Sequence, residues 1–200
     1  GEVYDALRET AVEGWSMASY DASAWKPAHE VALEGNISTV GNPNMPWVND
    51  YSGFELIGQF GQTVKQINEL TALSVEEVRP GVFVYDMGQN MVGVPRLTFK
   101  GKAGQEITIR FGEMNYPETI PTEPVAPYTI AMYKEKKGQV YTDNYRSALS
   151  TDRYILKGDA AGETYEPRFT FHGFRYVEIH GLERPLPLEA VKGIVLESIG

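Results

Sequence analysis

The sequence contains no cysteine among its 200 residues. Disulfide bonds, zinc–thiolate centres and a cysteine nucleophile are therefore excluded. Histidine is scarce as well, with three residues, and none of them stands in the His-x-His or HExxH spacing of a transition-metal site. No apolar run approaches the roughly 20 residues that a transmembrane helix needs, so we expect no membrane partner.

The sequence also lacks a basic cluster. Its formal net charge is −9 and its isoelectric point is about 4.9. The densest basic run, 134–137 (KEKK), is interrupted by a glutamate, and we interpret it as a solvated loop. Because nucleic acids and anionic membranes are bound by positively charged surfaces, we expect neither as a partner.

Glycine, proline and aromatic residues are plentiful instead. There are 20 glycines and 12 prolines, and aromatic residues make up 12% of the chain, a mixture that favours strands and turns over helices. The chain opens at residues 1–7 (GEVYDAL) in a strand-like pattern without an initiator methionine or a signal peptide. We therefore expect it to be a piece of a longer protein.

The strongest strand signal lies at 165–181, YEPRFTFHGFRYVEIHG. Residues alternate there with the period of a strand, which predicts one aromatic face and one polar face. We expect Phe169 and Phe171 to lie in the hydrophobic core and His172 to be a structural residue that holds a bend. Gly173 interrupts the alternation and predicts a β-bulge. The predicted polar face consists of Glu166, Arg168, Thr170 and His172.

Residues 96–100 and 106–111 also alternate, and the glycine-rich connection 101–104 predicts that they form an antiparallel hairpin. About ten to twelve strands and no clear long helix predict an all-β fold, an antiparallel β-sandwich of the jelly-roll type. A composition break suggests two parts. We expect 1–61 to be the end of an N-terminal accessory β-domain, or strands added to the main sandwich, and 62–200 to be the sandwich itself. The polar, proline-containing segment 116–150 is predicted to be the most mobile.

Four blocks, found in the same order, resemble bacterial α-L-rhamnosidase-type glycoside hydrolases: GEVYDALRE at 1–9, 81–113, NYRSALSTDRYILKG at 144–158, and 165–181. The resemblance implies a non-catalytic β-sandwich that precedes a catalytic helical barrel of the same chain. The whole enzyme would release terminal L-rhamnose with inversion, using two carboxyl groups of the barrel. We therefore expect no catalytic residue in this chain. The resemblance favours a periplasmic or extracellular enzyme, although the sequence itself does not select a compartment.

Two groups of residues are candidates for sugar binding. The resemblance places Asp5 where an acidic residue meets calcium, near Trp15 or Trp25. Calcium needs six to eight oxygen ligands. Ala6 follows Asp5, at a position where an amide side chain would supply one of these ligands and alanine does not. The alternative is that both tryptophans anchor a small core. The second group, Asp86, Gln89 and Asn90, either contacts a sugar or the catalytic domain, or caps a local turn.

Two functions remain open at this point. The first is a scaffold that packs against the catalytic domain. The alternative is a carbohydrate-binding module with weak, calcium-assisted affinity for rhamnose-containing carbohydrate, with no other cofactor expected. A third class, a protein-interaction β-domain of unrelated function, would require the resemblance to be accidental. A binding module should expose an aromatic side chain beside two or more converging polar groups, whereas a scaffold should bury its tryptophans.

Overall fold

The computed structural model forms two compact units, and each is described by itself. One unit comprises Gly1–Glu13 with Gln62–Gly200, and the other comprises Gly14–Gly61. The expected division into a domain that ends at residue 61 and a sandwich domain that begins at residue 62 stays a prediction. The structure describes residues 1–29, 37–38, 47–48, 55–58, 60–117, 133–146 and 148–198.

Strands account for most of the regular structure in the described residues. The strands are β1 (Val3–Asp5), β2 (Ile37–Ser38), β3 (Trp47–Val48), β4 (Lys65–Thr71), β5 (Ser74–Arg79), β6 (Val82–Phe99), β7 (Glu106–Gly112), β8 (Thr151–Ile155), β9 (Glu163–Tyr165), β10 (His172–His180) and β11 (Val191–Glu197). The short 3-10 helices are η1 (Ala6–Val12), η2 (Asp143–Tyr145) and η3 (Leu188–Ala190).

The smaller unit contains the antiparallel pair β2 and β3. Its first residues form a series of turns, in which Met17 N donates to Gly14 O and Tyr20 N donates to Met17 O. The rings of Tyr20 and Trp25 lie 5.4 Å apart, centroid to centroid. The nine other strands of the described residues, the long strand β6 among them, belong to the larger unit, and four of these, β5, β9, β10 and β11, pair with β6.

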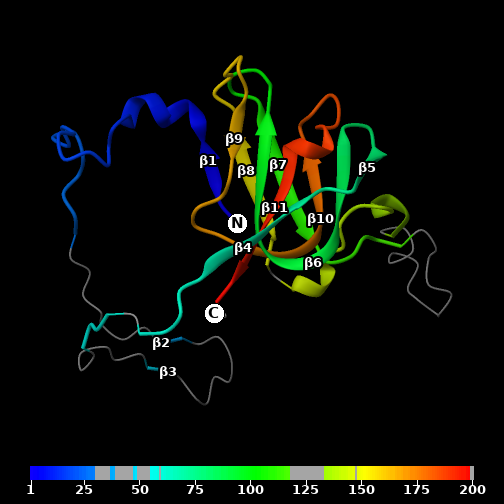
Figure 1. Ribbon diagram of the computed structural model, residues 1–200, viewed down its shortest axis with the longest axis horizontal. Coiled ribbons are helices and arrows are strands. Elements are labelled where there is room, and N and C mark those ends of the chain that lie inside the picture. Colours follow the sequence, from blue (N-terminus) through cyan, green and yellow to red (C-terminus); the bar gives the residue numbers. More distant parts are fainter. Residues whose placement is uncertain are drawn as a thin grey trace. The chain divides into compact units, whose positions relative to one another are not determined.

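The larger unit is one strongly curled sheet, with the strand order β1-β8-β7-β10-β6-β11-β4 (Figure 1). Strands β5 and β9 also pair with β6. The predicted all-β sandwich fold is confirmed, and the pairs are antiparallel except that β1 runs parallel to β8, with Val3 opposite Arg153. The jelly-roll subtype stays a prediction.

Strand β6 organises this sheet because its two halves have different neighbours. Residues 82–86 pair with β5 on one edge and with β10 on the other, and β10 pairs again with residues 91–93, whereas residues 93–99 pair with β11 and β9. Between the halves the register shifts: Asp86 faces Tyr176, but Met91 faces Phe174. Residues 87–90 therefore bulge from the strand, and Gly88 adopts a φ of +84° that only glycine tolerates readily.

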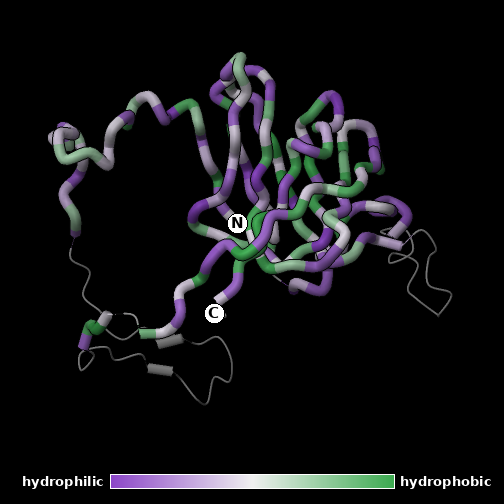
Figure 2. The backbone as a smooth tube through the Cα atoms, viewed as in Figure 1, coloured by the Kyte–Doolittle hydropathy of each residue, from purple (hydrophilic) through white to green (hydrophobic). Residues whose placement is uncertain are grey.

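The core lies within the curl of the sheet. Its largest fully buried side chains include Phe83 and Tyr85 of β6, Phe111 of β7 and Phe174 of β10. Hydrophobic residues recur along these central strands (Figure 2). Burial alternates along residues 106–111 of β7, as the sequence predicts, whereas three consecutive residues of β6, 83–85, are all buried, so that both faces of that strand are covered there.

The hairpin predicted for 96–111 is wrong in its pairing, although both of its strands exist. Strand β10 lies between β6 and β7, and β7 pairs with β10 and β8. The glycine-rich connection thus carries the chain past one intervening strand. Alternation alone reveals which residues form a strand, but it does not reveal which strand lies beside it.

The predicted continuous strand at 165–181 is also corrected. Strand β9 ends at Tyr165, and β10 begins at His172. Tyr165 faces Leu97 of β6, and His172 faces Gly93, so the chain between them leaves the sheet. Phe169 and Phe171 are consequently 94% and 66% exposed rather than in the core.

His172 is 7% exposed, so the expected polar face does not form around it. The register shift falls between Phe174 and Tyr176 instead of at Gly173. For the segment 116–150, its described flanks are anchored by Tyr116 (2% exposed) and Val140 (0%). Its predicted mobility concerns mainly residues 118–132, which lie outside the described residues, and it stays a prediction.

Replacing Phe174 with alanine should lower the free energy of unfolding of this chain by about 3–5 kcal/mol, because it empties a packed core position beside Phe111. Phe171→Ala should change it by less than about 0.5 kcal/mol, because that ring is largely in solvent. Urea denaturation followed by circular dichroism measures both. Equal losses for the two variants would contradict the placement of Phe171.

Candidate functional site

The bulge in β6 carries the predicted residues Asp86, Gln89 and Asn90. The carboxylate of Asp86 accepts two hydrogen bonds from Arg175, from Nε at 2.9 Å and Nη2 at 2.8 Å. It also accepts from the backbone N–H of Gly88 at 2.7 Å. The bonds from Arg175 lower the pKa of Asp86 more than its partial burial raises it. Asp86 therefore fixes the bulge, as the turn-capping alternative predicts.

Asn90 is also committed to local structure. Its side-chain N–H donates to Glu113 Oε1 at 3.0 Å. The backbone N–H of Glu113 in turn donates to the hydroxyl of Tyr145 at 3.2 Å. Gln89 is exposed at the tip of the bulge. The three predicted residues thus lie together on the bulge, where Asp86 and Asn90 hold local structure and Gln89 is exposed.

Asp5 caps the helix η1. Its carboxylate accepts from the backbone N–H of Leu7 at 3.1 Å and from Arg8 Nε at 3.1 Å. Among the described residues, no group of three or more histidine, cysteine or acidic side chains converges as a metal site would require. The local geometry is that of an N-cap, and calcium binding at Asp5 stays a prediction.

Trp15 and Trp25 are 57% and 49% exposed, so the alternative in which they anchor a small core is not supported by their burial. They belong to the smaller unit, whereas Asp5 belongs to the larger one. An exposed aromatic side chain is one of the two features expected of a sugar-binding module. The other feature is a set of polar groups that converge beside the ring, and the described residues form no such set at either tryptophan.

His172 contacts a buried carboxylate that the sequence did not indicate. Its Nε2 lies 3.1 and 3.0 Å from the two oxygens of Asp152, and its ring stacks on Phe111 with centroids 4.0 Å apart. Asp152 also accepts from the backbone N–H of Glu2 at 2.9 Å, which ties β1 to β8. The structural assignment of His172 agrees with these contacts, although its partner is a side chain rather than backbone.

Glu178 is a second buried carboxylate, in the middle of β10, and it is 0% exposed. Its Oε1 lies 2.6 Å from Nε2 of His180 and accepts from Arg110 Nη1 at 3.0 Å. Its Oε2 accepts from the backbone N–H of Val140 at 2.8 Å. Burial raises the pKa of Glu178, but these donors together lower the pKa by more than burial raises it, so that the pKa lies below its usual range.

Glu163 shows the same arrangement at a turn. It is 4% exposed and accepts hydrogen bonds from the hydroxyl of Tyr154 and from the backbone N–H groups of Lys157, Gly158 and Asp159. Every oxygen of these buried carboxylates is thus used to hold strands and turns together. None is placed beside a second free carboxyl group in the way that glycoside hydrolysis requires.

The surface of the larger unit has an apolar area that includes Phe171, which the sequence predicted to lie in the core. Val64, Val92, Phe171 and Leu196 line a hollow of about 320 Å³. Phe171 also forms part of a neighbouring hollow of about 380 Å³ with Leu149, which is 80% exposed. We call these five residues the Phe171 surface. Clustered exposed apolar side chains typically mark a docking site.

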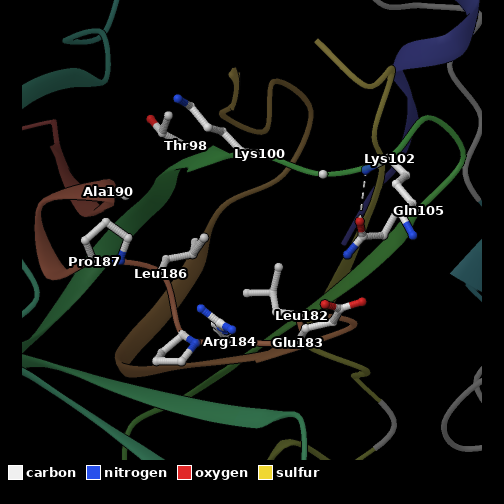
Figure 3. Close-up of a pocket in the computed structure, with 12 residues that line it drawn as sticks. Thr98, Lys100, Lys102, Gln105, Leu182, Glu183, Arg184, Leu186, Pro187 and Ala190 are labelled. Carbon is white, nitrogen blue, oxygen red and sulfur yellow. Dashed lines mark hydrogen bonds between the residues drawn. The ribbon is translucent and has the colours of Figure 1, made fainter. Parts of the chain in front are cut away.

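A further cleft of about 460 Å³ lies at the connection between β6 and β7, where Leu182, Leu186 and Pro187 form an apolar wall (Figure 3). Lys100 and Arg184 belong to its lining as well. Its amide side chain, Gln105, accepts from Lys102 N at 3.2 Å and donates to Gly181 O at 2.6 Å. The cleft therefore presents hydrocarbon and positive charge, but not the paired acids of a glycosidase.

Residues 76–197 match the family described as the bacterial alpha-L-rhamnosidase concanavalin-like domain. The chain belongs to this family. It is 38% identical over 198 residues to an alpha-L-rhamnosidase of Streptomyces avermitilis, covering 99% of this chain and 15% of that protein. The fold and the recognition of the family from four sequence blocks are both confirmed.

Solved structures of rhamnosidases agree. The S. avermitilis alpha-L-rhamnosidase complexed with L-rhamnose superposes with a TM-score of 0.66 at 35% identity, covering 98% of this chain and 15% of that one. The alpha-L-rhamnosidase from Dictyoglumus thermophilum gives 0.70 at 28% identity, covering 98% and 18%. The chain thus spans less than a fifth of the length of these relatives. Within its described residues, no helix is long and apolar enough to cross a membrane.

The buried carboxylate gives a pH-dependent prediction. Because the pKa of Glu178 is lowered in the folded state, its contribution to stability is present above the unfolded pKa of about 4.3 and is lost as the pH falls through the folded pKa. Glu178→Gln should therefore lower the free energy of unfolding by about 2–4 kcal/mol at pH 7, and by less at pH 3.5.

Urea denaturation at pH 7, 5 and 3.5 measures this difference. The exposed Glu189 provides a matched control, and Glu189→Gln should leave stability within about 0.5 kcal/mol of the parent at pH 7. A Glu178→Gln loss that stays constant over this pH range would show that packing, rather than the charged network, accounts for the effect.

Proposed function

We propose that this chain is a non-catalytic accessory β-sandwich of an α-L-rhamnosidase-like glycoside hydrolase, and that it acts as a scaffold for the catalytic helical-barrel domain of the same polypeptide. The whole enzyme would act on terminal L-rhamnose of glycans or glycosides. The observation that carries the scaffold role is the Phe171 surface, where Phe171 is 66% exposed, Val92 50% and Val64 64%. The chain spans 15% of its Streptomyces relative, which supports a large neighbouring part.

The chemistry of the Phe171 surface fits a permanent interface within one protein. Its five members are apolar, and burying such side chains is favourable by roughly 25 cal/mol for each Å² removed from water. Obligate interfaces are hydrophobic in this way, whereas transient ones are more polar. A second function, sugar binding at Trp15 or Trp25, is favoured by the exposure of both tryptophans, although the described residues supply no converging polar groups beside either ring.

If the Phe171 surface is an interface, Phe171→Ala should be nearly neutral in this isolated chain and costly in the full-length enzyme. We expect a loss of roughly 1–3 kcal/mol in the longer protein, because the ring is buried only there. Phe60→Ala is the matched control, since Phe60 is 92% exposed and lies in the other unit. Thermal unfolding of both proteins measures the difference. Equal effects of Phe171→Ala in the two contexts would refute docking at this surface.

The isolated chain should not hydrolyse an aryl α-L-rhamnoside, because the three buried carboxylates in the part of the chain that the structure describes are engaged in structural hydrogen bonds. Release of the chromophore is followed at several pH values, with the full-length enzyme as the positive control. Turnover above the buffer blank that persists through purification and that Glu178→Gln abolishes would overturn the non-catalytic assignment.

A further inference from the structure

A polar recess of about 480 Å³ lies beside the edge strand β5, and it shares no lining residue with the Phe171 surface. Glu76 and Glu77 of β5, Asn115 after β7, Lys137 and Tyr176 of β10 contribute to its wall. We call it the Tyr176 recess. Its volume falls in the range of small-molecule pockets, and it combines an aromatic ring with several hydrogen-bonding side chains.

Asn115 supplies the observation that points to a ligand. Its side-chain oxygen Oδ1 is buried and has no hydrogen-bond partner, the one such side-chain atom found in the described part of the chain. The backbone of Asn115 is fixed by a β-bridge to Val140. A buried acceptor without a donor costs free energy, which a ligand hydroxyl group would recover by donating a hydrogen bond.

The aromatic wall of the recess is held in position before any ligand arrives. The guanidinium of Arg175 lies over the ring of Tyr176, with Cζ 5.1 Å from the ring centroid. Arg175 is itself fixed by its two hydrogen bonds to Asp86. A ring that is immobilised in this way loses little further entropy on binding, which favours affinity for a weakly held ligand.

The recess is also lined by two carboxylates, which are negatively charged and accept hydrogen bonds. Glu77 Oε1 accepts from the backbone N–H of Gly81 at 2.9 Å, which orients its carboxylate. Glu76 pairs with Val84 through the strand ladder, and its carboxylate makes no hydrogen bond or ion pair with any of the described residues and is exposed. Two carboxylates and one amide oxygen favour a ligand that donates several hydrogen bonds. Lys137 adds one positive charge to the lining, but the two carboxylates outnumber it, so that the recess still disfavours an anion.

We propose that the Tyr176 recess binds one ring of a neutral carbohydrate, with a C–H face against Tyr176 and hydroxyl groups donating to Asn115 Oδ1 and to Glu76. The site is separate from the predicted residues Asp5, Trp15 and Trp25. It does not depend on the scaffold role, because it shares no residue with the Phe171 surface.

The test is an NMR titration of the ¹⁵N-labelled 200-residue chain with methyl α-L-rhamnoside and, in a second arm, methyl α-D-glucoside. We expect saturable shifts of the Asn115 side-chain amide and of the Tyr176 backbone amide, with a Kd in the millimolar range for at least one sugar. D-Galacturonate, which carries a negative charge, should bind more weakly than either.

Asn115→Leu should weaken binding at least about tenfold, the effect of losing one well-placed hydrogen bond. Its melting temperature should stay at or above that of the parent, because the substitution removes the unpaired acceptor. Tyr176→Leu should also weaken binding. The control is Asn90→Leu, which removes an amide that bonds to Glu113 outside the recess and should leave the Kd unchanged.

Absence of saturable shifts at these two amides up to about 100 mM of both neutral sugars overturns the proposal, because a site with a millimolar Kd would be largely occupied at that concentration. An unchanged Kd in Asn115→Leu, or tighter binding of D-galacturonate, also overturns it. Loss of binding in Asn90→Leu but not in Asn115→Leu would move the site to the bulge of β6. None of these results bears on the Phe171 surface, which is tested by stability in the longer protein.

Discussion

The paired hydrogen bonds between Asp86 and Arg175 hold the irregularity on which the whole sheet depends. They join β6 and β10 at the place where residues 87–90 leave the register, so that β10 pairs with β6 on both sides of the bulge. The pair is partly exposed to solvent, so its contribution to stability is modest. Its geometry matters more, because a bidentate arginine–carboxylate contact fixes the relative position of two backbones.

The distribution of polar and apolar groups in the larger unit is partly inverted. Asp152, Glu163 and Glu178 are inside, and each is fully supplied with donors, whereas Phe169 and Phe171 are outside. Buried charges of this kind are retained only when their hydrogen bonds are complete, and they specify one arrangement of strands over others. The exposed rings, in contrast, make no such contacts within the described part of the chain and would gain stabilisation only from a neighbouring domain that buries them.

The sequence was sufficient to predict the fold class, because period-two alternation and turn residues are local signals that survive in 82–99, 106–112 and 172–180. It was insufficient for pairing and for the ends of strands. Residues 166–171 continue the alternation of a strand, yet they do not pair with β6, whose ladders with this segment end at Tyr165 and begin again at His172. Asp152, the partner of His172, and Val140, a partner of Glu178, come from other parts of the chain, and no local pattern predicts a contact between residues 20 or 38 positions apart.

The parallel pairing of β1 with β8 has a consequence for how the chain is made. Val3 meets Arg153, so the smaller unit and most of the sheet are synthesised between the two partners. At translation rates of about 5–20 residues per second, β1 waits roughly 8–30 s for its neighbour to leave the ribosome. During that interval its backbone N–H and C=O groups form an unsatisfied edge, which is open to chaperones and to wrong partners. Closing so long a loop costs little more entropy than closing a short one, so the delay is set by synthesis and by search rather than by the final stability of the pair.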